Sequence, residues 1–223
     1  MKRNNNFTLV ELLVSIGIIV ILAAILVPVV SSAIGKAEVA KAKTGITTLV
    51  NAIKQYESTY HKLPLPDGYE ENDIIGDGDS SDTSYKRYKW LIELLQGQET
   101  LSNSSTFGTQ AKKNPRKMQF LDIQGNNPGE FLDPWDNNYR IILDKNYKSK
   151  LIKPEIPGVT DSNWKEEDSK KVLYYDIVVW SIGPDGEFKA GKNKSDRTDD
   201  SNEDNIYSFN TGWDKNAGHV VQR

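Results

Sequence analysis

The fold of this chain is decided by residues 7–30, which read FTLVELLVSIGIIVILAAILVPVV. From Leu12 to Gly35 the chain carries no charged residue, and this stretch exceeds the roughly 20 apolar residues that a membrane-spanning helix needs. The short segment ahead of it contains Lys2 and Arg3, and a basic tail of this kind favours retention on the cytoplasmic side. We therefore expect a single-pass membrane protein whose bulk lies outside the cytoplasm.

Glu11 is the one charged residue inside this apolar segment. An ionisable side chain in a membrane helix costs about 2 to 4 kcal/mol and usually marks function, so we expect a positive charge to neutralise Glu11. If a peptidase cut the chain between Asn6 and Phe7, the new amine of Phe7 on an axially shifted neighbouring copy would reach Glu11. The energetic cost of an unpaired Glu11 in a single subunit would then favour the assembly of many subunits.

Two simpler interpretations of the same segment compete with this one. A secretory signal peptide also has a basic start and an apolar core, and Ser31-Ser32-Ala33 resembles its cleavage site. The apolar core here is longer than the usual 7 to 15 residues and contains Glu11. A plain single-pass anchor explains the hydrophobicity equally well, but it leaves Glu11 unexplained.

The start of the chain resembles a known processing signal. Residues 7–13, FTLVELL, follow a basic leader and precede an apolar helix that contains Pro28, and this pattern resembles the processing and methylation motif of the type IV pilin superfamily. In that family a prepilin peptidase removes the leader and methylates the new N-terminal Phe. The resemblance implies that Phe7 becomes the mature terminus, that Glu11 is the assembly glutamate and that copies polymerise into a filament. The residue before the cut is usually Gly, and here it is Asn6.

The helix is expected to continue beyond the membrane. An apolar stripe recurs at spacings of three and four residues, and Leu63-Pro64-Leu65-Pro66 then ends the pattern because proline lacks an amide donor. Pro28 and Gly45 are expected to bend or loosen this helix. The predicted organisation is a leader (1–6), a transmembrane helix (7–30), an amphipathic half of the same helix (31–62) and a globular head (63–223). The stripe comprises Ile46, Leu49, Val50, Ile53, Tyr56 and Tyr60.

The head reads as a small antiparallel sheet packed on the long helix, which makes the predicted fold an α+β, pilin-like one. A short helical stripe covers 88–95, whereas 101–116 is poor in apolar residues and reads as irregular. Trp135 follows Asp133-Pro134 in a predicted turn, and we interpret it as a core side chain. β-branched and aromatic runs predict strands at Met118–Ile123, Tyr139–Leu143 and Leu173–Ser181.

The C-terminal part of the head carries a second resemblance. The segments 133–139 (DPWDNNY), 181–186 (SIGPDG) and 203–206 (EDNI) resemble, in order and spacing, the major pseudopilin of type II secretion, whereas 67–130 has no counterpart there and reads as inserted loops. The resemblance implies a structural calcium ion in the acidic loop 183–206. Its ligands would be the carboxylates of Asp185, Glu203 and Asp204 and the carbonyl oxygen of Ile182.

The residues alone leave this loop open to two interpretations. Calcium takes 6 to 8 oxygen ligands, and the loop offers enough carboxylates for it. The same loop also contains interleaved lysines, among them Lys189 and Lys192, and this composition equally fits a solvated hydrophilic loop without a metal.

Composition narrows the class of function. The chain has 223 residues, a net charge of -3 and no cysteine, so it offers neither a basic surface for nucleic acid nor thiolate metal sites. No catalytic motif stands out, and the two histidines, His61 and His219, lie far apart in sequence. We therefore expect a protein that is not an enzyme and does not bind nucleic acid.

The leading hypothesis is a structural subunit of the type II secretion pseudopilus. Such a subunit would reside in the cell inner membrane with its head in the periplasm, and would form a filament after assembly. Its implied partners are copies of itself, the prepilin peptidase, other pseudopilins and the inner-membrane assembly platform. One alternative is a type IV pilin of a surface fibre for adhesion, motility or DNA uptake. Another is a membrane-anchored ligand-binding protein that uses Trp164 and Trp180 at its surface.

Overall fold

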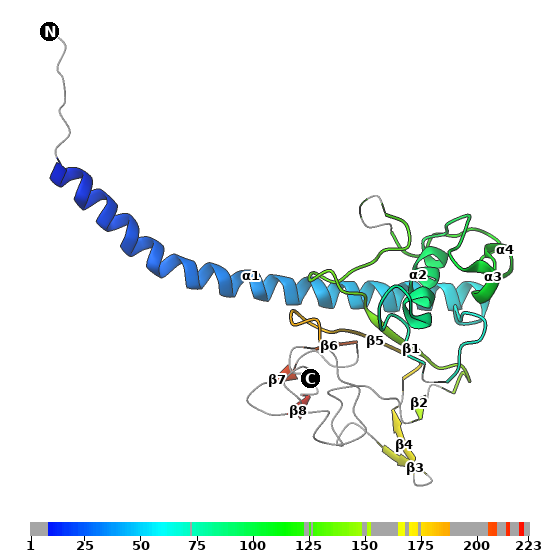
Figure 1. The fold of residues 1–223 in the computed structure, drawn as a ribbon. Helices are drawn as coiled ribbons and strands as arrows, with labels where there is room; N and C mark the ends of the chain where they lie inside the picture. The colour runs from blue at the N-terminus through cyan, green and yellow to red at the C-terminus, as the bar shows by residue number, and fades with distance from the viewer. Residues whose placement is uncertain are drawn as a thin grey trace. The chain divides into compact units, whose positions relative to one another are not determined.

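The computed structural model describes residues 9–71, 73–122, 125, 127–148, 151–152, 165–167, 170–173, 175–187, 205–208, 213–214 and 219–220. The chain divides into two compact units, Met1–Ala40 and Lys41–Arg223. A single helix, α1 (Leu9–Tyr60), contributes to both of them (Figure 1). It continues as a helix through Pro28 and Gly45.

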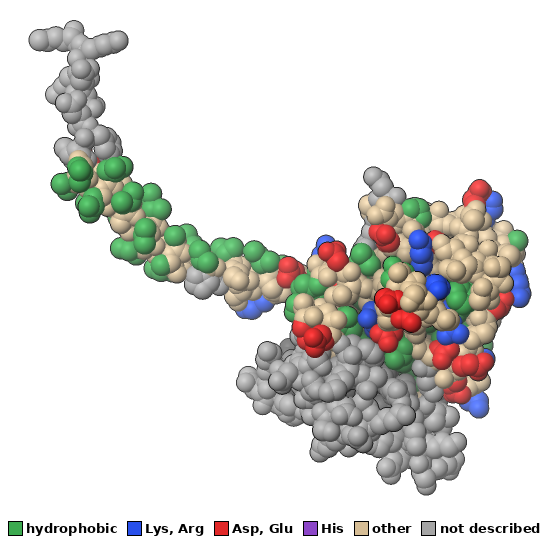
Figure 2. All heavy atoms as spheres, in the orientation of Figure 1, with side chains coloured by type: hydrophobic (Ala, Val, Ile, Leu, Met, Phe, Trp, Pro, Cys, Tyr) green, Lys and Arg blue, Asp and Glu red, His purple; other side chains and the backbone are tan. Residues whose placement is uncertain are grey.

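The part of α1 in the smaller unit exposes nearly all of its apolar side chains. The large apolar residues between Leu9 and Ile34 are 51 to 78% exposed, and Figure 2 shows them covering this stretch of the helix. A water-exposed surface of this extent is unfavourable at about 25 cal/mol per Å². By length and composition α1 is apolar enough to cross a membrane.

The part of α1 in the larger unit buries one face, as the stripe predicts. Ile46, Leu49, Ile53 and Tyr56 are at most 3% exposed, while Val50 and Tyr60 are half-buried. The predicted end of the helix is confirmed to within a few residues, because α1 stops at Tyr60. The adjacent buried positions that complete this face are Ala42 and Ala52.

Gly45 lies where a side chain of the larger unit approaches α1 closely. A Cβ built on Gly45 would lie 2.1 Å from the Oη of Tyr139, and that hydroxyl donates to the carbonyl oxygen of Ala42 at 3.4 Å. Tyr139 is 1% exposed. Glycine is therefore required here for packing, since any larger residue would overlap the buried phenol.

A small antiparallel sheet runs beside this part of α1 (Figure 1). It has the order β1-β5-β6, formed by β1 (Arg140–Leu143), β5 (Ile177–Ser181) and β6 (Ile206–Tyr207). Every residue of the three strands is buried. The register places Ile141 opposite Val179, and Ile75 adds an isolated bridge to Ile141. The predicted α+β architecture, a long apolar helix with a small antiparallel sheet, is confirmed.

The remaining strands pair separately. One sheet has the order β2-β4-β3 and another pairs β7 with β8, all antiparallel. The bounds are β2 (Leu151–Ile152), β3 (Lys165–Glu167), β4 (Lys170–Leu173), β7 (Trp213–Asp214) and β8 (His219–Val220).

Several local predictions for the head are wrong. The segment predicted as a strand at 118–123 forms no strand over its described residues, because the amides of Phe120 and Leu121 instead donate to the carbonyl oxygen of Leu95. That oxygen belongs to the last turn of α2 (Thr83–Leu95), whose helical stripe was predicted correctly. The predicted strand 173–181 is two strands, since β4 ends at Leu173 and β5 begins at Ile177.

The segment 101–116, predicted to be irregular, contains two short helices. These are α3 (Ser104–Phe107) and α4 (Gln110–Lys113). Phe107 is buried, and its ring contacts that of Trp90 edge-on, with a centroid distance of 6.4 Å. Phe107 and Leu101, both 3% exposed, therefore provide buried apolar contacts for a segment whose overall composition is polar.

Candidate functional site

The residues that the sequence predicts to act in assembly lie in the first half of α1. Glu11 occupies the first turn of α1 and is exposed within a single chain; the Ser15 hydroxyl donates to the Glu11 carbonyl oxygen at 2.7 Å. Pro28 lies within α1, and its side chain falls outside those that the structure describes. Asn6 and Phe7, between which cleavage is predicted, lie outside the described residues.

Asp133 organises the turn that joins the long loops to β1. Its Oδ1 accepts the amides of Trp135 and Asn137 at 3.0 and 2.9 Å, and its own amide donates to the Asn137 carbonyl oxygen at 2.9 Å. Aspartate suits this position because a short carboxylate reaches amides two to four residues ahead in its own turn. The predicted turn is thus present, and Asp133 closes it.

The second oxygen of the same carboxylate reaches another part of the chain. Asp133 Oδ2 accepts the Ser181 hydroxyl at 2.6 Å, and the Ser181 Oγ in turn accepts the amide of Gly183 at 3.2 Å. The Asn137 side-chain amide donates to the Gly183 carbonyl oxygen at 3.3 Å. Two segments that are 48 residues apart are therefore joined at the point where β5 gives way to the last loop.

This carboxylate is buried. Asp133 is 4% exposed and Ser181 is fully buried. Burial raises the pKa of Asp133 above its ordinary value, and the hydrogen bonds from Ser181, Asn137 and Trp135 oppose that rise. The network therefore stabilises a charge that the surroundings disfavour. We did not predict the Asp133–Ser181 bond, although both of its residues belong to the segments that carry the pseudopilin resemblance.

Trp135, expected in the core, is only half-buried. The core positions are taken by Tyr139 and Trp180, which are 1% and 0% exposed. In the turn that Asp133 closes, the side chain of Trp135 is only partly covered by the rest of the head. The buried side chain of the DPW segment is that of Asp133. The hypothesis that Trp180 lies at a binding surface is also wrong, because Trp180 stacks on Tyr207 inside the core. Trp164 lies outside the described residues.

Two of the four residues implied as calcium ligands are described. Ile182 is 2% exposed, and Asp185 is exposed, with its Oδ1 accepting the amide of Glu187 at 2.9 Å. Glu203 and Asp204 lie outside the described residues. Within the part of the chain that is described, no group of three or more His, Asp or Glu side chains could hold a metal ion.

One comparison bears on the start of the chain. A model of the prokaryotic N-terminal methylation motif matches residues 1–27. The match includes Glu11 and supports a type IV pilin-like or pseudopilin protein. The motif implies processing by a prepilin peptidase and assembly into pilin-type polymers, and so a structural protein. Together with the apolar helix it suggests a membrane-anchored, single-pass protein. No curated protein and no solved structure matches the chain.

Proposed function

We propose that this chain is a structural subunit of a type II secretion pseudopilus, which supports the export of folded proteins. The observation that carries the proposal is the processing motif on an exposed apolar helix. The choice of secretion rests on the two head segments that resemble the major pseudopilin, 133–139 and 181–186. The contact between Asp133 and Ser181 supports this choice, because it joins those two segments.

The exposed apolar part of α1 is suited to two environments. Its side chains, 51 to 78% exposed in the single chain, would be covered by lipid before assembly and by the helices of other copies afterwards. Because lipid tails are as apolar as leucine, exchange between the two gives little net hydrophobic gain. An additional interaction must therefore favour the filament.

Glu11 would provide that interaction. After cleavage behind Asn6, the amine of Phe7 in one copy would pair with the Glu11 carboxylate of its neighbour. A charge pair in low dielectric is strong, whereas a single carboxylate in lipid is costly. The pair joins one defined group in each copy, the amine of Phe7 and the carboxylate of Glu11. It would therefore fix the axial shift between neighbouring copies as well as stabilise their contact.

We also propose that the last loop holds a structural calcium ion. Asp185, Glu203 and Asp204 would supply carboxylate oxygens and Ile182 a carbonyl oxygen, the ligand types that calcium prefers. Asp185 is exposed at the start of the loop, and the Asp133–Ser181 network holds the backbone of Gly183 two residues before it. A bound ion would offset the entropy of ordering a long loop that lacks a disulfide.

The experiment that tests the assembly proposal compares two glutamates of α1. The full chain is produced with a prepilin peptidase, and the products are examined by intact-mass analysis and electron microscopy. The wild type should lose residues 1–6 and form filaments. Glu11→Val should insert into the membrane and be processed but form none. Glu38→Val, just beyond the apolar segment of the same helix, is the matched control and should assemble.

Two results would overturn this assignment. Normal filaments from Glu11→Val would refute the charge-pairing step, and a chain that keeps its first six residues would refute processing after Asn6. Deleting the chain from its own cell separates secretion from a surface fibre. Loss of an exported folded protein with surface fibres intact supports the pseudopilus, whereas loss of the fibres alone supports a type IV pilin.

A further inference from the structure

The larger unit contains a polar pocket that the assembly proposal does not use. Its volume is about 310 Å³, and it lies between α2, the loop around Gly129, the turn after Asp133 and the start of β1. Small-molecule pockets usually run from roughly 300 to 1,000 Å³, so this one suits a ligand of about one sugar residue. The residues of interest are Tyr85, Lys89, Glu130, Asp136, Asn138 and Arg140.

The walls of the pocket are held in place by internal contacts. The Tyr88 hydroxyl donates to the Phe131 carbonyl oxygen, and the amide of Gly129 donates to the Gln96 side-chain oxygen at 2.7 Å. A Cβ built on Gly129 would lie 2.9 Å from the side chain of Glu93 on α2. The loop and the helix are thus packed as closely as glycine permits, and the pocket is formed before any ligand arrives.

Arg140 forms part of the pocket wall, and its charge is already balanced. It is 8% exposed, its Nη1 donates to the Asn138 carbonyl oxygen at 2.8 Å, and its Nε lies 3.3 Å from Asp77 Oδ1 in an ion pair. An anionic ligand would therefore have to compete with Asp77 for this guanidinium.

The charges around the pocket also disfavour anions. Lys89 and Arg140 carry positive charge, whereas Glu130 and Asp136 in the lining and the adjacent Asp77 are acidic. Two cations against three carboxylates leave a net charge of -1. The site therefore offers no positive potential to attract a phosphate or a carboxylate.

The remaining chemistry favours a neutral ligand with many hydroxyl groups. The lining offers donors in Lys89 and the Asn138 amide, acceptors in Glu130 and Asp136, and a half-buried aromatic ring in Tyr85. Sugar hydroxyls both donate and accept, and the C–H face of a sugar ring packs on an aromatic side chain. We propose that this pocket binds a neutral saccharide residue of a glycan; the location of that glycan outside the cytoplasm rests on the proposed function.

The test uses the full chain in a dimethylamine-oxide detergent, because common maltoside detergents would themselves present sugars. Glucose, galactose, mannose and N-acetylglucosamine are each added at about 10 mM, a concentration that fills a millimolar site, and binding is followed by saturation-transfer NMR. Glucuronate is the charged comparator. At least one neutral sugar should bind, and glucuronate should bind more weakly.

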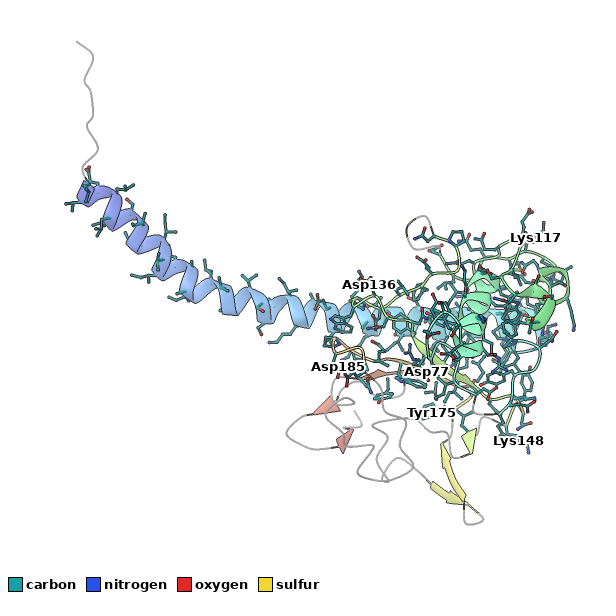
Figure 3. The ribbon with its side chains drawn as sticks, viewed as in Figure 1. Asp77, Lys117, Asp136, Lys148, Tyr175 and Asp185 are labelled. Carbon is teal, nitrogen blue, oxygen red and sulfur yellow. The ribbon has the colours of Figure 1, made fainter. Side chains whose placement is uncertain are left out.

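Three variants connect the binding to the pocket. Tyr85→Ala removes the aromatic face and should weaken binding by about tenfold. Asp136 is exposed and has a left-handed backbone conformation (φ 64°) that asparagine also tolerates, so Asp136→Asn should leave the fold intact. Because the change removes a carboxylate acceptor from the lining, it should reduce sugar binding. Tyr175→Ala is the matched control, because Tyr175 is also partly exposed and Figure 3 places it well away from Asp136. It should bind as the wild type does.

The proposal is overturned if none of the four neutral sugars binds, or if glucuronate binds as tightly as they do. It is equally overturned if Tyr85→Ala and Asp136→Asn, both shown to be folded by circular dichroism, bind sugar like the wild type. A loss in Tyr175→Ala equal to that in Tyr85→Ala would also refute it. None of these results depends on whether the chain polymerises.

Discussion

Replacing Asp133 with alanine is expected to destabilise the larger unit. The change removes a carboxylate that accepts hydrogen bonds from the Ser181 hydroxyl and from the amides of Trp135 and Asn137, at 2.6, 3.0 and 2.9 Å. Ser181 is fully buried, so its hydroxyl would lose a partner that water could not easily replace.

The expected magnitude follows from those three bonds. A buried hydrogen bond contributes about 1 kcal/mol net, and more when the acceptor is charged. Burial of the carboxylate, which raises the pKa of Asp133, offsets the additional strength from charge. The loss should therefore be about 3 kcal/mol, which corresponds to a fall in melting temperature of roughly 6 to 12 °C for a domain of this size.

Thermal unfolding of the full chain in detergent, followed by near-ultraviolet circular dichroism of its tryptophans, measures this change. Asp133→Asn keeps one carbonyl oxygen for the two amides and should cost about 1 kcal/mol. Asp136→Asn, in the same turn but exposed, is the matched control and should unfold like the wild type.

The reasoning would be refuted by a small effect. If Asp133→Ala unfolds within about 0.5 kcal/mol of the wild type, as ordinary surface substitutions do, the bond to Ser181 contributes little to stability. An equal loss in Asp136→Asn would assign the effect to the turn as a whole and would refute a specific role for Asp133.

Three further predictions follow from the structure. Gly45→Ala should destabilise by about 1 to 3 kcal/mol through overlap with Tyr139, whereas Gly35→Ala, with open space around it, should not; equal melting temperatures would contradict the close approach. Because burial raises the pKa of Asp133 above 3.8, the folded protein binds the Asp133 proton more tightly than the unfolded chain does, and this proton-linked part of the stability is fully present below that pH and is lost as pH rises through the folded-state pKa. Unfolding at several pH values should show this loss in the wild type and not in Asp133→Asn; parallel pH curves would contradict it. Chelation with EDTA should lower the melting temperature of the wild type but not of Asp185→Ala; no shift in the wild type would discard the calcium proposal.

The features predicted correctly from sequence are those that depend on spacing within one segment. The apolar run and the stripe from Ile46 to Tyr56 specify α1, because helical periodicity is local and the segment is long. The strand β1 follows from a β-branched run. The end of α1 is also local, since the left-handed residue His61 and the prolines that follow it stop the helix.

The features that sequence did not reveal depend on contacts between distant segments. Residues 118–122 have a strand-like composition, but the carbonyl oxygen of Leu95 takes two of their amides. The Asp133–Ser181 bond spans 48 residues, a distance over which no periodic pattern operates. Three features stay predictions: cleavage between Asn6 and Phe7, the pairing of Glu11 with the amine of a neighbouring copy, and the calcium ligands.

The absence of a Cβ at Gly45 has a consequence for how copies of the protein would pack against one another. An apolar stripe alone allows a sheet to settle at several angles around its helix, because one aliphatic contact replaces another at little cost. The close approach of the Tyr139 hydroxyl at Gly45 adds a specific contact, which favours one rotation of the sheet that contains β1 about the axis of α1. A larger residue there would turn a different surface toward neighbouring subunits, even if the protein remained folded.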